Sequence, residues 1–296
     1  MSNGILYVLL ILGMVSWGES WISAKLLTGH AAPEVLVFWR FLFTWVSFVP
    51  VMLLMKQTFR INFKGLLTAF LTALLLVIYN EMFFTGLIYG LAGAGGILVT
   101  TLVPVLTFAL GCVITKKAPT GKDTLGLLLG AVGASVIMEI WKMDLHLLFK
   151  SGNAYFLTAA LFWAFLTHAS TRAKKYTSAY TFSFWLFFFT SVLILPVIWF
   201  KGLPVTVEMN TSFVVNLLLI AFGATTYGTT IYFVATAALG GQKASSFIFL
   251  VPLNALVMSY FFLGEAIRIN TIVGGLSAIT AVYLINYRKK PKLKAA

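Results

Sequence analysis

The sequence predicts an all-α integral membrane protein in which ten transmembrane helices form two inverted five-helix repeats. Three observations carry this prediction. Of the 296 residues, 60% are hydrophobic and 10% are charged, whereas a soluble domain has about 25% charged residues. The apolar residues fall into ten segments of membrane-crossing length, and the first five segments recur in the second half. A surface this poor in charge suits lipid rather than water, which argues against a soluble enzyme.

Each apolar segment has roughly the 20 residues that a helix needs to cross about 30 Å of hydrocarbon. The segments lack the alternation of a membrane strand, so helices must satisfy the backbone hydrogen bonds within the lipid. The first run follows MSNGILYVLL without a positive n-region, and we expect it to remain as a helix. The predicted spans are 4–26, 34–55, 65–88, 94–115, 123–141, 152–171, 179–200, 212–235, 243–263 and 269–287.

Basic residues indicate the orientation of the chain. An even number of spans places both termini on one side of the membrane. Of the 21 Lys and Arg residues, fifteen fall on that side, five fall on the other side, and Arg40 lies within a span. The positive-inside rule therefore predicts cytoplasmic termini. The clusters, such as 56–64 and 172–175, lie between apolar runs and form no nucleic-acid-binding stripe. The single cysteine, Cys112, excludes a disulfide framework and a cysteine metal site.

An internal repeat divides the chain. FWRFLFTWVSFVP (38–50) matches FWLFFFTSVLILP (184–196) at an offset of 146, and LVP (102–104) matches LVP (250–252) at an offset of 148. A two-residue insertion within 200–210 explains the change of offset. Because five is odd, the second repeat enters the membrane from the opposite side, the plan of many secondary transporters. We expect repeats at 1–141 and 150–288 and a basic cytoplasmic tail at 289–296.

Several short motifs occur in a characteristic order: WG (17–18), WA (163–164), FWRF with Arg40, GLIYGLAGAGGILVTTLVP (86–104), YFVATAALGGQKASSFIFLVP (232–252) and FLGE (262–265). Over nearly its whole length the chain resembles the EamA-type drug/metabolite transporter superfamily. The resemblance implies ten helices, a central cavity lined mainly by spans 1, 3, 4, 6, 8 and 9, and export of small metabolites across the inner or plasma membrane. Two positions depart from that pattern: Lys117 stands where the second half has Glu265, and Glu19 is charged where the family is usually uncharged.

Three charged residues lie inside predicted spans at similar depth, toward the outer side of each midpoint: Glu19, Arg40 and Glu81. A charge at the bilayer centre costs at least about 2.5–3.5 kcal/mol, and the repeat shows that the fold does not require one. The equivalent residues in the second half are Phe165, Leu186 and Thr229. Function is therefore the favoured explanation, and a structural ion pair between Arg40 and either glutamate is the alternative.

The substrate-binding region is expected to combine these charges with mid-span aromatic and polar side chains of both halves. Aromatic faces would hold an apolar group or a cation, although repeated aromatic residues also pack scaffolds. The candidates are Trp17, Glu19, Arg40, Tyr79, Asn80, Glu81, Thr101, Trp163, Tyr227, Thr230 and Asn254.

Proton coupling and gating have their own candidates. Glu19 and Glu81, shielded from bulk water, are candidates for binding and releasing protons, and His168 is a third, with a packing role as its alternative. Pro104 and Pro252 occupy matched mid-span positions, where each removes a helix hydrogen bond and favours a hinge or gate.

The sequence thus favours a secondary transporter, an exporter of a small polar metabolite such as an amino acid or related amine, working by alternating access. An importer or uncoupled facilitator of an organic cation is the alternative. No metal-binding motif or nucleophile elbow supports a membrane-embedded enzyme, and no cofactor or metal is expected. The expected partners are the substrate, lipid and protons. Gly126 and Gly130 form a face of small residues, which allows close packing of another helix. We prefer packing of span 5 on span 10 of the same chain over a homodimer interface, and we expect a monomer or weak homodimer.

Overall fold

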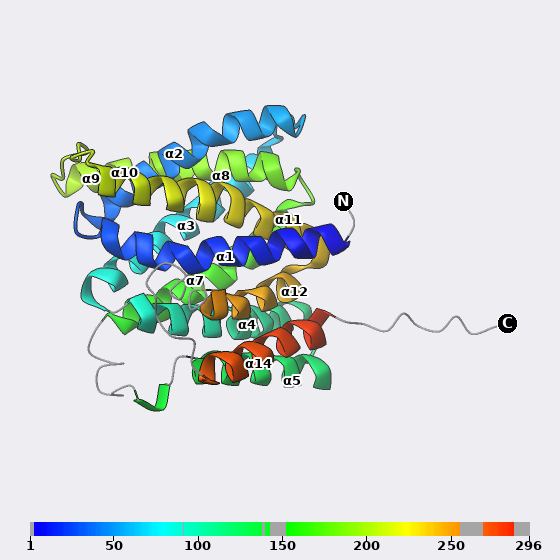
Figure 1. The fold of residues 1–296 in the computed structure, drawn as a ribbon. Helices are drawn as coiled ribbons and strands as arrows, with labels where there is room; N and C mark the ends of the chain where they lie inside the picture. Colours follow the sequence, from blue (N-terminus) through cyan, green and yellow to red (C-terminus); the bar gives the residue numbers. More distant parts are fainter. Residues whose placement is uncertain (1–2, 91, 138–139, 143–151, 255–268, 287–296) are drawn as a thin grey trace.

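The computed structural model describes residues 3–90, 92–137, 140–142, 152–254 and 269–286. These residues form helices and no strand, which confirms the all-α prediction (Figure 1). The FLGE motif at 262–265 and the tail at 289–296 lie outside them. The helices are α1 (Asn3–Leu27), α2 (Pro33–Leu54), α3 (Phe63–Tyr89), α4 (Ala92–Thr115), α5 (Gly121–Ile137), η1 (Ile140–Lys142), α7 (Asn153–Ala173), α8 (Ala179–Leu193), α9 (Leu195–Phe200), α10 (Thr211–Leu218), η2 (Leu219–Thr229), α11 (Thr230–Leu239), α12 (Gly241–Ser246), η3 (Phe247–Leu250) and α14 (Ile269–Asn286).

Within the described ranges, six helical segments are long and apolar enough to cross a membrane. They are Gly4–Leu27, Pro33–Leu54, Phe63–Tyr89, Leu98–Thr115, Ala179–Phe200 and Thr211–Leu239. Helices α5, α7, α12 with η3, and α14 occur where four further spans are predicted. The count of ten and the cytoplasmic side of the termini stay predictions.

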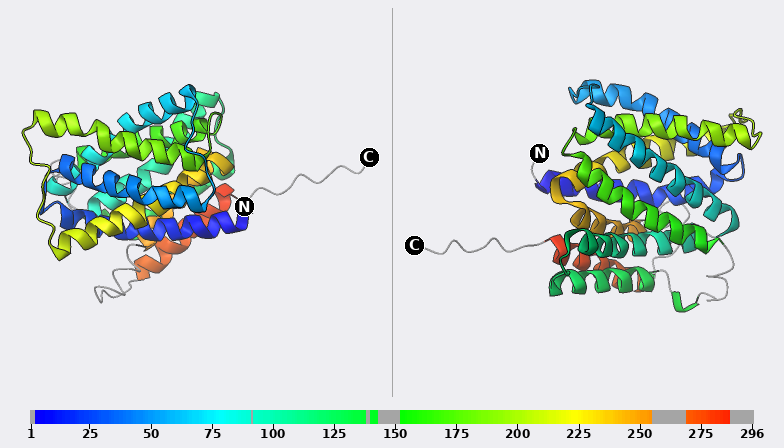
Figure 2. Two further views of the ribbon diagram at one scale, coloured as in Figure 1. Left: turned by 90° about the horizontal axis from the view of Figure 1, so that it is seen from above. Right: turned by 180° about the vertical axis from the view of Figure 1, so that it is seen from behind.

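The helices lie alongside one another, and α1 begins at the end of the bundle where α14 finishes (Figure 1). Many contacts between helices occur twice, between equivalent pairs of helices. Helix α3 of the first half packs on α7 and α8 of the second half, and its counterpart η2 packs in the same way on α1 and α2. The equivalent helices α2 and α8 pack on each other, as do α5 and α14. Figure 2 shows α5 and α14 together at one edge of the bundle. Matched contacts of this kind are what an inverted repeat requires.

Two tryptophans connect the halves by equivalent hydrogen bonds. Trp39 Nε1 donates to the Val205 carbonyl at 2.9 Å, and Trp185 Nε1 donates to the Phe59 carbonyl at 2.9 Å. Both the donors and the acceptors are 146 residues apart in the sequence. Each repeat therefore bonds to the loop of the other in the same way, which supports the alignment found by sequence.

Equivalent asparagines cap the next helix of each half. Asn62 Oδ1 accepts from the Gly65 amide at 2.7 Å, and Asn210 Oδ1 accepts from the Phe213 amide at 2.9 Å. Such caps satisfy amides that the first helical turn leaves without a partner. The two asparagines are 148 residues apart, so the two-residue insertion lies between Val205 and Asn210.

Small residues allow α5 to approach α14 closely. A Cβ on Gly133 would lie 2.7 Å from the Gly274 carbonyl oxygen and 3.1 Å from the Ala278 nitrogen, and a Cβ on Gly126 would lie 2.6 Å from the Ile285 side chain. Gly130 instead faces Phe249. The small-residue face of α5 thus packs against helices of the same chain, as predicted for spans 5 and 10.

Gly133→Ala is expected to destabilise the protein by about 1–3 kcal/mol, because the added methyl group meets backbone atoms that cannot rotate away. Thermal unfolding of the detergent-solubilised protein measures the change. Gly121→Ala is the matched control, since no atom lies within 4 Å of its Cβ position. A melting temperature for Gly133→Ala equal to or above that of the control would contradict the close contact.

Trp39→Phe and Trp185→Phe are expected to destabilise the protein by similar amounts, roughly 0.5–1.5 kcal/mol each, because each removes one hydrogen bond from a helix to the loop of the other half. Trp199→Phe serves as the control, since Trp199 is exposed. Unfolding curves of the three variants test the equivalence, and a large effect of only one of the first two substitutions would argue against it.

Candidate functional site

A small cavity lies between the two halves, lined by residues from α1, α2, α3, α4, α7, η2 and η3. Four of the predicted binding residues line it: Trp17, Arg40, Tyr79 and Trp163. The space open to a water-sized sphere is about 40 Å³, enough for a few water molecules and far below the several hundred Å³ of a typical small-molecule site. A bound organic solute would therefore require the surrounding helices to separate.

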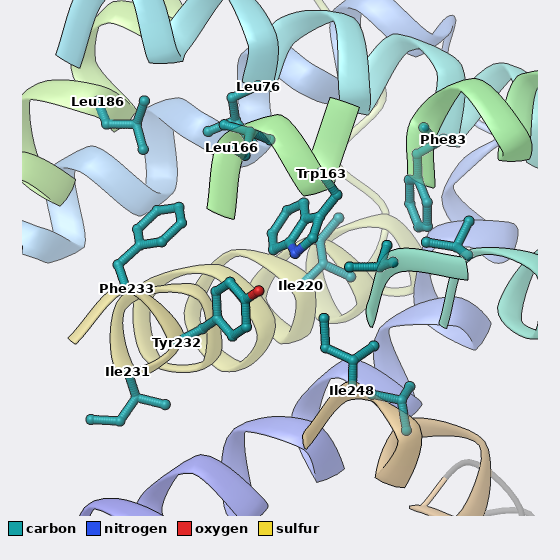
Figure 3. Packing of buried hydrophobic residues seen from close by; sticks show 14 of the residues in the cluster. Leu76, Phe83, Trp163, Leu166, Leu186, Ile220, Ile231, Tyr232, Phe233 and Ile248 are labelled. Carbon is teal, nitrogen blue, oxygen red and sulfur yellow. The ribbon is translucent and has the colours of Figure 1, made fainter. Parts of the chain in front are cut away.

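Aromatic rings form the centre of this cavity. Trp17 and Trp163, equivalent residues of the two repeats, meet edge to face with ring centroids 5.1 Å apart. Tyr79 packs on Trp163 at 4.6 Å, and Tyr232 packs on Trp17 at 5.2 Å. Figure 3 shows the ring of Trp163 beside Tyr232, with Ile248 nearby. The symmetry-related tryptophans thus meet where the two halves meet, and such ring pairs contribute about 0.5–1.5 kcal/mol each beyond their buried area.

Arg40 is the one charged side chain among the described residues that line the cavity. It is 8% exposed. Its Nε donates to Thr225 Oγ1 at 2.8 Å, and one terminal nitrogen donates to Asn80 Oδ1 at 3.0 Å. Asn80 is itself fixed by a hydrogen bond from its Nδ2 to the Leu76 carbonyl. A guanidinium has five N–H donors, so three have no hydrogen bond within the described part of the chain.

Neither glutamate pairs with Arg40, and neither lines the cavity. The reason is helix geometry. Helix α1 presents Trp17, Ser20 and Trp21 to the cavity, and successive residues turn by about 100°. Glu19 therefore faces away, where it accepts a hydrogen bond from Ser23. Glu81 follows Tyr79 by two residues on α3 and is turned away for the same reason.

Glu81 lies instead within electrostatic reach of Glu34 and Lys201. Glu34, in the first turn of α2, forms an ion pair with Lys201, which directly follows α9. The hydrogen bond to Glu34 raises the pKa of Lys201. One carboxyl oxygen of Glu81 is buried without a hydrogen-bond partner in the described residues. The glutamate thus belongs to a charge cluster at the end of the bundle away from the start of α1.

The segment that holds Arg40 from the second half has a π-helical hydrogen-bond register. Within η2, the hydroxyls of Thr225 and Thr229 donate to the carbonyls of Ile220 and Ala224, five residues earlier in each case. The Ala224 carbonyl also accepts from Trp17 Nε1 at 2.9 Å. Irregular helix turns of this type are frequent at functional sites, and this one contacts both Arg40 and Trp17.

Besides Asn80, which bonds to Arg40, four predicted uncharged polar residues lie outside the cavity lining. Tyr227 donates from its hydroxyl to the Leu9 carbonyl at 2.8 Å, joining η2 to α1. The hydroxyls of Thr101 and Thr230 and the Nδ2 of Asn254 are buried without a described partner. Asn254 also lines a separate pocket between α1, η3 and α14.

The gating and proton-relay candidates are also away from the cavity lining. Pro104 lies inside α4, and Pro252 lies in the helical residues 251–254 that follow η3. His168 Nε2 is 2.9 Å from the Thr107 carbonyl, which joins α7 to α4. That hydrogen bond favours the packing role that the sequence left as the alternative for this histidine.

Several residues that line the central cavity, among them Trp21 and Phe83, are not among the predicted binding residues. Trp21 and Phe83 follow Trp17 and Tyr79 by four residues, so helical spacing alone places each pair on one face. The contact between Arg40 and Thr225 joins residues 185 positions apart, and no pattern in the sequence indicates it.

Known proteins resemble this chain over its whole length. The sequence profile of the EamA-like transporter family matches residues 4–139 and again 150–287. Two proteins of Bacillus subtilis strain 168, described as the uncharacterized transporters YvbV and YoaV, are 23% and 25% identical. These alignments cover 98% and 94% of this chain and 94% and 96% of the relatives. An uncharacterized transporter of Archaeoglobus fulgidus is 22% identical over 95% of this chain and 97% of its own length.

A protein of known crystal structure has the same fold, with a TM-score of 0.73 and 14% sequence identity over 95% of this chain and 94% of that one. The double match of one family profile agrees with the two repeats and with the paired contacts across the bundle. The chain therefore belongs to the EamA-like transporter family and is a multi-pass membrane protein, which in bacteria resides in the plasma membrane.

Proposed function

We propose that this transporter carries a small organic solute with a carboxylate group, such as an amino acid, and that the carboxylate binds Arg40. The observation that carries the proposal is the state of Arg40: it is buried, it lines the central cavity, and three of its donors lack a hydrogen bond among the described residues. A secondary transporter is expected because the chain has two inverted halves around this cavity.

A carboxylate suits the geometry and charge of Arg40. The guanidinium is planar and donates two parallel hydrogen bonds to the two oxygens of a carboxylate. Thr225 and Asn80 orient the guanidinium but supply no negative charge, and a charge held in the membrane interior without a counter-ion is unfavourable. The substrate would supply the missing charge.

The aromatic side chains would contact the rest of the substrate. Trp17, Tyr79 and Trp163 line the cavity and offer ring faces to an apolar side chain or to an ammonium group. An organic cation without a carboxylate would meet the positive charge of Arg40, and the glutamates that would attract it lie outside the cavity lining. The cavity thus supports a zwitterion or anion over the organic cation of the alternative hypothesis.

Transport would proceed by alternating access, in the direction of export that the resemblance to drug/metabolite transporters implies. The cavity of this structure, about 40 Å³, is too small for an organic solute. Opening to either side requires α1 and α7 to separate from the facing helices. The π-helical turn η2 and the prolines of the fourth and ninth predicted spans, Pro104 and Pro252, are the places where the backbone hydrogen-bond ladder is weakest.

Coupling to protons forms a second part of the proposal. One carboxyl oxygen of Glu81 has no hydrogen-bond partner among the described residues and lies near the Glu34–Lys201 pair, so protonation of Glu81 would change the charge balance at that end of the bundle. Glu19, bonded to Ser23 on α1, is the other candidate. Either group would exchange a proton while the solute moves the other way.

Arg40→Leu is expected to abolish carboxylate binding, with at least a tenfold loss of affinity for amino acids, because the ion pair is removed. Leu186 occupies the equivalent position of the second half, so a leucine suits the scaffold. The measurement is a thermal-shift screen of amino acids against their uncharged amides, followed by counterflow in liposomes. Wild-type protein should respond to the acids alone. Equal responses to acids and amides, or undiminished binding by Arg40→Leu, would overturn the assignment.

Glu81→Gln is expected to remove the acceleration of transport by a pH gradient while leaving solute counterflow intact, because counterflow needs no net proton movement. Proteoliposomes with and without an imposed gradient measure both activities. Glu19→Gln tests the other candidate, and Glu208→Gln, at an exposed loop position, is the control. Coupling through these glutamates is wrong if both Glu19→Gln and Glu81→Gln keep gradient-driven transport.

A further inference from the structure

A groove runs along the flank of the bundle between α3, α4 and α7, with a volume of about 850 Å³. It is separate from the central cavity, with which it shares no lining residue. Its lining includes the apolar side chains of Leu71, Leu75, Phe162 and Phe165, together with polar ones such as Thr72 and His168. Leu71 and Leu75 offer a hydrocarbon-like surface along about one turn of α3.

One end of the same groove is basic. Arg172, in the last turn of α7, and Lys175, three residues later, both line it and are exposed. Neither side chain has a hydrogen bond or an ion pair in the described part of the chain, and no Asp or Glu is among the lining residues. Tyr176 completes this end. The groove therefore joins an apolar wall to two cations without a counter-ion.

The basic end lies on the side of the bundle where α1 begins, which is the side predicted to be cytoplasmic. Charge on that side is expected in general, but the repeat shows that these two positions are not fixed by the fold. At the offset of 146, the equivalents of Arg172 and Lys175 are Leu26 and Gly29. These two cations are thus particular to the second half.

We propose that this groove binds one anionic phospholipid. The phosphate would lie between Arg172 and Lys175, with the Tyr176 hydroxyl as a further donor, and an acyl chain would lie along Leu71 and Phe165. A soluble phosphate would use only the basic end and leave the apolar wall unfilled. A zwitterionic lipid would fill the wall but would leave the two cations uncompensated. Basic pockets between transmembrane helices bind acidic headgroups for the same reason.

The bound lipid would hold α3, α4 and α7 together beside the substrate path. Helices α4 and α7 also line the central cavity, through Thr100 and Trp163. This role does not depend on which solute is carried or on proton coupling, so the test below stays valid if the proposed substrate class fails.

The experiment uses the full chain purified in a neutral detergent. Phosphatidylglycerol, phosphatidylcholine with the same acyl chains, and inorganic phosphate are added separately, and native mass spectrometry and thermal unfolding are recorded. We expect one retained phosphatidylglycerol per chain and a higher melting temperature with that lipid only. Equal retention of phosphatidylcholine, or the same stabilisation by inorganic phosphate, would overturn the proposal.

A pair of matched variants locates the site. Arg172→Gln with Lys175→Gln is expected to weaken phosphatidylglycerol binding roughly tenfold, since each basic residue near an acidic headgroup contributes severalfold in affinity. Lys56→Gln with Arg60→Gln removes the same charge from exposed residues on the same predicted side, outside the groove. If both double variants lose equal affinity, the effect is one of net charge, and the groove is not the site.

Discussion

The buried guanidinium of Arg40 is the constraint on which the centre of this structure depends. It is held by one residue from each half, Asn80 of α3 and Thr225 of η2, so its position is defined only when the two repeats are packed together. The charge has no counter-ion among the described residues. A positive centre of this kind favours a substrate that brings its own negative charge, and the carboxylate proposed above rests on this argument.

The inverted repeat explains how such a centre is built from a short chain. Trp17 and Trp163 meet edge to face, and Trp39 and Trp185 make equivalent hydrogen bonds to the loop of the other half. The symmetric residues form the scaffold, whereas the residues that break the symmetry carry the charge. Arg40 faces the cavity, whereas its counterpart Leu186 is apolar. Arg172 and Lys175 line a groove, whereas their counterparts Leu26 and Gly29 are uncharged.

The charged side chains that the proposals use lie at three separate places in the bundle. Arg40 is inside the cavity, whereas Glu81 stands near the Glu34–Lys201 pair at one end of the bundle. Arg172 and Lys175 lie at the opposite end of the bundle, where their side chains are exposed. A substrate group, a proton and a lipid headgroup would then each meet a different set of charges, which allows the three interactions to respond to separate substitutions.

The sequence by itself determined the helical membrane architecture, the repeat and its offset, because these follow from hydrophobic segment length and from similarity between the halves. It also identified Trp17, Arg40, Tyr79 and Trp163 as central. Only the tertiary structure decided the partners of Arg40 and the orientation of Glu19 and Glu81. Spacing along one helix gives relative directions, but which face meets the cavity depends on how every helix is rotated against its neighbours, and Thr225 is brought to Arg40 by that packing alone.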